Sequence, residues 1–264
     1  MNTKLISIDL KSQFGFLKKI DTNAGIYFTY NIIHRPALLG ILGAICGLKG
    51  MYQAYPNGVP EYWEKLENIK LSIVPLNSQK GLYNKTIVQY NNSVGYASQE
   101  QGGNLIIKEQ ILIKPSYRIY LKLDVENNVE RNLYLNLKNG HAVYIPYLGK
   151  NDFQLWWDNF SEIENFVQDY KPTSKFRIDS IFYKEKSERI NNRQPQGLGM
   201  EIDLESALSP EVFAYFEQLP FEFNDVTGNY NLKSFSYTNM MLPQSFKAEK
   251  LCKIENGDTI IQLF

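Results

Sequence analysis

The chain has 264 residues, of which 44% are hydrophobic and 21% charged, with 28 basic and 28 acidic side chains. These values are typical of globular proteins and exclude a disordered or fibrous chain. Balanced charge also excludes a field over the whole molecule that would attract nucleic acid or an anionic membrane. Any affinity for nucleic acid must therefore come from a local patch.

Charge is distributed unevenly along the sequence. The first 60 residues hold six basic and two acidic side chains, a local net charge of +4. Residues 200–225 hold seven carboxylates and no Lys or Arg, a local net charge of −7. We therefore expect one basic face and one acidic face, the latter solvated or used for protein docking.

The sequence shows no pattern typical of a cofactor or of a membrane protein. Cys46 and Cys252 lack the spacing of a zinc site, and the acidic segment lacks that of a calcium loop, so we expect core cysteines and no metal or other cofactor. The amino terminus does not resemble a signal peptide. The longest apolar stretch, Pro36–Leu48, has 13 residues, too few to span a bilayer. We expect a cytoplasmic protein that does not contact membranes.

The first third of the chain predicts a strand, a long loop and a helix. Leu5–Leu10 has the composition of a strand. Residues 11–30 mix Lys, aromatic residues, Gly and Asn without a helical period, which is typical of a long functional loop. A helix should begin at Pro36 and end at Gly47 or Gly50. Its glycines at three- and four-residue spacing permit close approach of a neighbouring backbone.

The next elements complete a β-α-β-β-α-β order. Residues 61–67 predict a short helix, and 69–76 predict a strand. Residues 78–103 are rich in Gly and Asn around a β-type stretch, which favours a protruding hairpin. The remaining expectations are strands over 105–123 with a break near Pro115, a helix over 129–137, and a strand over 141–146. This order is the ferredoxin-like arrangement of RNA-recognition domains.

The pattern changes after Gly149. A Trp/Phe-rich segment covers 153–166, and strands are expected near 175–185, 198–203, 230–237 and 259–264. The sequence thus predicts an α+β protein with two parts. Residues 1–149 form a ferredoxin-like domain with the hairpin at about 78–103, and residues 150–264 form a β-rich subdomain.

Four segments resemble the family-five CRISPR proteins of the RAMP group, particularly the type I-B branch. They are residues 8–19 (IDLKSQFGFLKK), 35–48 (RPALLGILGAICGL), 117–121 with 143–149 (YRIYL, VYIPYLG), and 219–223 with 237–239 (LPFEF, YTN). The resemblance rests on the order and spacing of all four segments. The sequence departs from the family where Ile33-His34 replaces the usual Pro-Pro, and where Pro36 replaces the usual Thr. These departures affect the local loop geometry, whereas Arg35 itself is retained.

The resemblance implies an antiviral role as a subunit of a type I interference complex, known as Cascade. Such a protein has a ferredoxin-like domain with a hairpin called the thumb. It holds the 5′ handle of the guide RNA and contacts the large subunit and the first backbone subunit. Target DNA is read by the guide RNA rather than by this protein.

A protein contacts RNA phosphates with basic side chains and stacks aromatic rings on RNA bases. Loops that carry both kinds of side chain are therefore candidate RNA-binding sites. Lys18 and Lys19 beside Phe16 have this combination, although a solvated loop anchored by its rings has the same composition. Arg35 stands where a helix begins and could clamp a phosphate, or could form a surface ion pair. The full set of candidate RNA-binding residues is Lys11, Phe14, Phe16, Lys18, Lys19, Arg35, Tyr83, Asn84, Lys85, Lys108 and Arg118.

Two alternative functions remain open. A relative of this family in type I-C systems cleaves precursor RNA, and His34 is chemically capable of acid–base work. However, a lone histidine without an identified partner is more often structural, so we expect no catalytic residue. The other alternative is a protein-interaction module without RNA contact.

Overall fold

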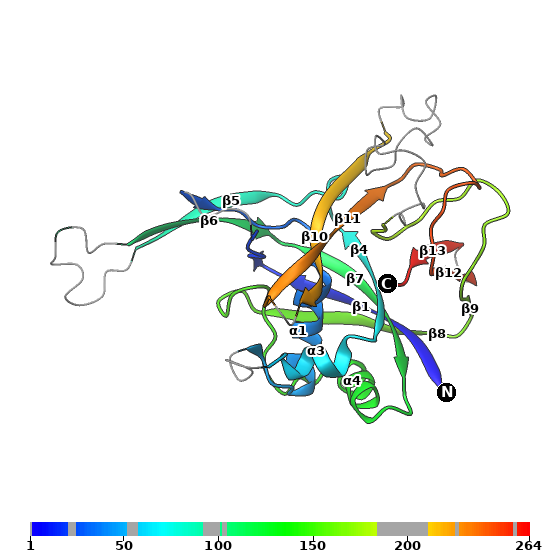
Figure 1. Ribbon diagram of the computed structural model, residues 1–264, viewed down its shortest axis with the longest axis horizontal. Coiled ribbons are helices and arrows are strands. Elements are labelled where there is room, and N and C mark those ends of the chain that lie inside the picture. Colours follow the sequence, from blue (N-terminus) through cyan, green and yellow to red (C-terminus); the bar gives the residue numbers. More distant parts are fainter. Residues whose placement is uncertain are drawn as a thin grey trace.

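A computed structural model describes residues 2–20, 25–51, 58–91, 101, 105–183, 211–224, 227–255 and 258–264. The predicted strand at 198–203 and the tip of the predicted hairpin lie outside these residues. Figure 1 shows a body of sheets and helices from which one hairpin extends.

The body is built on a four-stranded sheet of β1 (Thr3–Ser12), β4 (Lys70–Leu76), β7 (Ser116–Asp124) and β8 (Leu155–Ile163). Its order is β4-β7-β1-β8, and every neighbouring pair is antiparallel. Helix α1 (Arg35–Cys46) connects β1 to β4, and helix α4 (Asn128–Asn139) connects β7 to β8. This connectivity and strand order confirm the predicted ferredoxin-like fold.

One predicted element of this sheet was wrong. Residues 141–146 form no strand, and the fourth strand is β8, from the Trp/Phe-rich segment. The apolar side chains that suggested a strand are instead exposed in a loop, in which the Val143 and Tyr144 N–H groups donate to carbonyls at the end of α1. These bonds hold the loop against the helix end, so its backbone pairs with no strand at this point.

Both long helices lie within two residues of their predicted bounds. Pro36 lies in the first turn of α1, which ends at Gly47 with φ 76°, and α4 ends at Gly140 with φ 63°. Glycine adopts such left-handed angles at no steric cost, so it commonly marks a helix end. A Cβ on Gly43 would lie 2.4 Å from Tyr62 Cβ, so this glycine permits the close contact with α3 (Glu61–Leu66).

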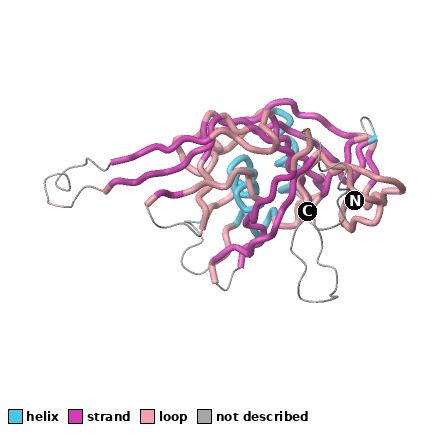
Figure 2. The backbone as a smooth tube through the Cα atoms, turned by 90° about the horizontal axis from the view of Figure 1, so that it is seen from above, coloured by secondary structure: helices cyan, strands magenta, loops and turns pink. Residues whose placement is uncertain are grey.

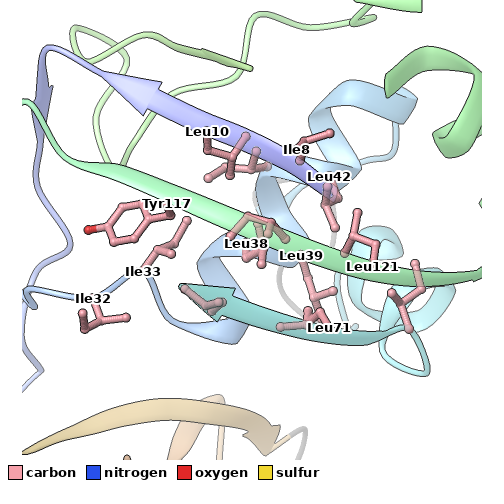
Figure 3. Packing of buried hydrophobic residues seen from close by; sticks show 14 of the residues in the cluster. Ile8, Leu10, Ile32, Ile33, Leu38, Leu39, Leu42, Leu71, Tyr117 and Leu121 are labelled. Atoms are coloured by element: carbon pink, nitrogen blue, oxygen red, sulfur yellow. The ribbon is translucent and has the colours of Figure 1, made fainter. Parts of the chain in front are cut away.

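The main hydrophobic core lies between the sheet and the helices. Alternate residues of β1, such as Ile8 and Leu10, meet Leu38 and Leu42 of α1 on one face of the sheet (Figure 3). Leu219, Phe235 and Phe264, from far along the chain, belong to the same core.

The carboxy-terminal part adds two small sheets. β10 (Ala214–Asn224) pairs with β11 (Asn229–Thr238), and β12 (Leu251–Ile254) lies between β13 (Thr259–Gln262) and β9 (Phe166–Val167). The strand expected near 175–185 is wrong over the described residues 175–183, which make only isolated bridges at Phe176 and Phe182. Because β8 pairs with β1 and the main core contains residues from both predicted parts, the division at residue 150 marks no break in the packing.

The projecting hairpin consists of β5 (Lys85–Asn91) and β6 (Ile106–Ile113). Figures 1 and 2 show the two strands leaving the body side by side. β5 falls within the predicted range of 78–103, whereas β6 lies beyond it. Among the described residues, no helix is long and apolar enough to cross a membrane.

Candidate nucleic-acid interface

The basic, aromatic segment 11–30 and the hairpin form one sheet. The segment contributes β2 (Phe14–Gly15) and β3 (Ile26–Tyr27), which both pair with one edge of β6, while β5 pairs with the other. The expected loop therefore contains two very short strands. We call the four strands the hairpin sheet. It pairs residues of the segment with residues 82 to 99 positions further along the sequence.

Strand register divides the hairpin into two faces. Gln89 lies opposite Lys108, and Val88 lies opposite Glu109. Directly opposite residues point to the same side and successive residues alternate, so Gln89 and Lys108 share one face and Val88 and Glu109 the other. We call the first the open face and the second the packed face.

The packed face lies against the body through aromatic and aliphatic side chains. Phe16, Ile111 and Phe153 form a small buried cluster, with Tyr27 and Val88 packed against it. The predicted contact residue Phe16 is only 7% exposed, so its ring anchors the sheet and is not available to stack on a base. For Phe16, the alternative of a loop anchored to the core by its rings therefore agrees with the structure, and the prediction of RNA contact does not.

Phe14 and Lys18 remain accessible beside the packed face. Phe14 is 43% exposed, and its ring lies 5.9 Å from that of Phe153. Lys18 is exposed, and its ammonium lies 4.0 Å from the centre of the Tyr27 ring. This arrangement holds a cation and a ring close to the base of the hairpin.

The open face carries polar and basic side chains, except at its base, where Leu112 is buried in the main core. Lys108 and Gln89 are exposed, Lys85 is partly buried, and Ile87 is 54% exposed. Lys85 Nζ donates to Asn31 Oδ1 at 3.2 Å, and partial burial lowers the pKa of this ammonium. Asn84, which the sequence also singled out, is exposed where β5 begins.

A buried polar cluster fixes the base of the hairpin. Asn31 donates to the Gly81 carbonyl at 2.6 Å and accepts from the Tyr83 N–H at 3.0 Å. Glu217 on β10 accepts from the Asn31 N–H at 3.0 Å, and its carboxylate lies 3.7 Å from Lys19 Nζ. The cluster connects the basic segment, the hairpin and β10.

Two expectations are corrected by this cluster. Tyr83 is 6% exposed and its hydroxyl donates to the Leu76 and Ser116 carbonyls, so it supports the hairpin from inside. Glu217 belongs to the acidic segment but its side chain is only 7% exposed, so it is no part of a solvated face. Residues 200–210 and 225 of that segment lie outside the described residues.

Arg35 lies inside the fold and not on its surface. It is 8% exposed, its guanidinium donates to the Glu67 and Phe221 carbonyls, and it lies 5.4 Å from the ring centres of Trp63 and Phe221. Neither the expected phosphate clamp nor the surface ion pair agrees with this position. Desolvation lowers the pKa of the guanidinium, and the side chain joins α1 to α3 and β10.

Lys11 and Arg118 are residues of the four-stranded sheet and not of the hairpin sheet. Lys11 Nζ is 2.6 Å from Asp158 Oδ2, and Arg118 Nε is 2.7 Å from Asp9 Oδ1. Burial alone would raise the pKa of Asp9, but hydrogen bonds from Arg118 and Asn159 outweigh it and lower this pKa. Both predicted contact residues are therefore already paired with carboxylates.

His34 caps α1. Its Nδ1 accepts the Ala37 N–H at 3.2 Å, and burial lowers the pKa of the imidazole to about 3. A pKa this low is unsuited to general acid–base catalysis at neutral pH. In addition, Nδ1 is already occupied by the capping hydrogen bond. Among the described residues, no group of three or more His, Cys, Asp or Glu side chains is placed to hold a metal.

Lys150 is a contact residue of the hairpin that sequence reasoning missed. Its ammonium lies 2.6 Å from Glu109 Oε2 and 4.3 Å from the centre of the Tyr90 ring. The sequence contained a signal that could have pointed to Lys150, because this residue directly follows the Tyr-Leu-Gly that ends a segment of the family resemblance. Only the folded chain shows that this position meets the hairpin.

Comparisons with known proteins give structural neighbours only. No protein-family model and no curated protein matches this chain. A chain of a "CRISPR RNA-guided surveillance complex" aligns with a TM-score of 0.47 and 10% identity over 93% of this chain and 94% of that one. A CRISPR protein from Archaeoglobus fulgidus aligns with a TM-score of 0.42 and 11% identity over 99% of each chain.

A third neighbour is a chain of the type III-B Cmr-beta complex bound to cognate target RNA and AMPPnP. Its TM-score is 0.49 and its identity 8%, over 98% of this chain and 99% of that chain. The neighbours are thus CRISPR-associated proteins. Each of these scores lies below 0.5, so this likeness does not determine what the chain binds.

Proposed function

We propose that this chain is a non-catalytic, RNA-binding subunit of a type I CRISPR interference complex, of the family-five RAMP kind and the type I-B branch. In that role it caps the 5′ handle of the guide RNA and docks the large subunit and the first backbone subunit. It meets target DNA only through the complex. The observation that carries the proposal is the hairpin sheet, which joins the basic, aromatic segment to a projecting hairpin whose open face holds lysines.

The hairpin sheet has the chemistry that a single RNA strand requires. Lys108 and Lys18 supply cations for phosphates, and Gln89 supplies an amide that can hydrogen-bond a base edge. Phe14, at 43% exposure, and Ile87, at 54%, give unpaired bases apolar surface. Because the whole chain carries no net charge, the affinity must come from these local groups. Lys108, Gln89 and Ile87 lie on the open face, whereas Lys18 and Phe14 lie beside the packed face.

The loop after α4 supports the docking part of the proposal. Val143, Tyr144, Ile145 and Tyr147 are between 44% and 62% exposed and follow one another closely in the chain. A concentration of exposed apolar side chains commonly marks a protein contact. The backbone bonds of this loop to the end of α1 hold it in place for a partner.

The alternative function, cleavage of precursor RNA, depended on His34. Its capping hydrogen bond and its pKa of about 3 favour binding without chemistry at this residue. The sites proposed here therefore include no catalytic group.

A single binding experiment separates the candidate functions. The purified full chain is incubated with labelled repeat-derived RNA in EDTA, and the products are resolved on native and denaturing gels. We expect a shifted, uncleaved RNA, and Lys108→Ala should weaken the shift more than Lys49→Ala, which changes an exposed lysine after α1. Cleaved RNA would support the endoribonuclease, and neither shift nor cleavage would leave the protein-interaction module.

A further inference from the structure

Lys150 connects the body of the protein to both strands of the hairpin. It belongs to the loop before β8, and its ammonium contacts Glu109 of β6 at 2.6 Å and the Tyr90 ring of β5 at 4.3 Å. The Phe16 ring lies 5.6 Å from the same ammonium. We call Lys150, Glu109, Tyr90 and Phe16 the latch.

The two charged groups of the latch are partly shielded, and its two hairpin residues share one side of the hairpin, where the Tyr90 ring is still 39% exposed. The side chain of Glu109 is 9% exposed and that of Lys150 is 27% exposed. Tyr90 and Glu109 point to the packed face by the register of β5 and β6. An ion pair in such a place is less screened than one on the surface, and removing one partner leaves the other charge poorly solvated.

The backbone before Lys150 is fixed against the hairpin sheet. The Phe16 N–H donates to the Leu148 carbonyl at 3.0 Å, and Gly149 has φ +86°. A Cβ on Gly149 would lie 1.7 Å from the Phe16 carbonyl oxygen, so only glycine permits this approach. The backbone next to Lys150 is therefore held in place, and the contact of Lys150 with Glu109 fixes the hairpin relative to the body.

We propose that the latch holds the hairpin at one angle to the body and that Lys150 and Glu109 are positioning residues for RNA, which they do not touch. The proposal rests on the proposed function for its RNA readout. Nearer the body, the hairpin is held by Phe16, Ile111 and Phe153. The contacts of Lys150 with Glu109 and Tyr90 extend this support outward along the two strands, where the open face presents Gln89 and Lys108.

The chain supplies a matched control on the same strand. Lys108 is adjacent to Glu109 but points to the open face, so Lys108→Met removes one charge from the hairpin without affecting the latch. If Lys108 contacts a phosphate, this change lowers the slope of log affinity against log salt by about 0.7. Lys150→Met removes the same charge and should leave that slope unchanged.

Glu109→Gln gives the sharpest test because the two explanations predict opposite signs. Simple electrostatics predicts tighter RNA binding when a carboxylate is removed from the hairpin. The latch predicts weaker binding, by roughly fivefold, which is the effect of losing one partly buried ion pair worth about 1 kcal/mol. Lys150→Arg retains both the charge and the ring contact and should bind as the parent does.

The experiment measures RNA affinity by fluorescence anisotropy over a range of salt, together with hydrogen exchange of the free full chain. We expect Lys150→Met and Glu109→Gln to weaken binding at unchanged salt slope and to speed amide exchange in 85–91 and 106–113. Lys108→Met should not change that exchange. Tighter binding by Glu109→Gln, a lower slope in Lys150→Met, or unaltered exchange would each overturn the latch. If the parent binds no RNA, the proposed function fails, while exchange still decides whether the latch exists.

Discussion

Gly149→Ala tests whether the contact between the loop and the hairpin sheet stabilises the fold. At φ +86°, alanine is strained by about 1–2 kcal/mol whatever surrounds it. In addition, the new Cβ would lie 1.7 Å from the Phe16 oxygen, so the backbone must move by more than 1 Å. That movement breaks the bond from the Phe16 N–H to the Leu148 carbonyl, which contributes about 1 kcal/mol.

The total expected loss in the free energy of unfolding is about 3–5 kcal/mol, because strain, displacement and the lost hydrogen bond add at one place. Gly140→Ala is the matched control, since Gly140 has φ +63° and nothing within 4 Å of a new Cβ. It should lose only the strain of about 1–2 kcal/mol. Urea unfolding followed by circular dichroism measures both variants. Equal losses at the two glycines would refute the reasoning, because they would show that the loop yields freely at residue 149.

Three further predictions concern charge and pH. Lys18→Ala with Lys108→Ala should lower the salt slope of RNA binding by about 1.4, twice the value for one single-strand phosphate contact, and an unchanged slope would remove both lysines from the interface. Arg35→Met should leave that slope unchanged, because the guanidinium is buried against Trp63 and Phe221; a lower slope would return Arg35 to the RNA site. His34 has a pKa lowered from 6.5 to about 3, so its contribution to stability is complete above pH 6.5 and is lost as pH falls toward 3. His34→Asn retains a capping side chain and should flatten this part of the stability–pH curve in urea titrations; an identical curve would show that the imidazole is not its cause.

The sequence by itself determined the features that have local causes. Pro36 and Gly47 mark the ends of α1 because proline lacks an N–H and glycine accepts left-handed angles, and both effects act within a few residues. Strand-type composition located β1 and β7, and alternating apolar residues located β4, since both signals are local. The connection order then indicated a ferredoxin-like sheet.

Only the tertiary structure decided which segments meet. Residues 141–146 and 155–163 are both apolar enough for a strand, and the choice of β8 depends on pairing with β1 from the other end of the domain. Arg35 was expected to clamp a phosphate or to form a surface ion pair because it stands where a helix begins. Instead its guanidinium is buried and donates to the carbonyls of Glu67 and Phe221, which are distant in sequence. Lys150 meets Glu109, 41 positions earlier in the sequence, beside the close approach of Gly149 to Phe16. These outcomes depend on burial and on partners far along the chain, which no local pattern of residues encodes.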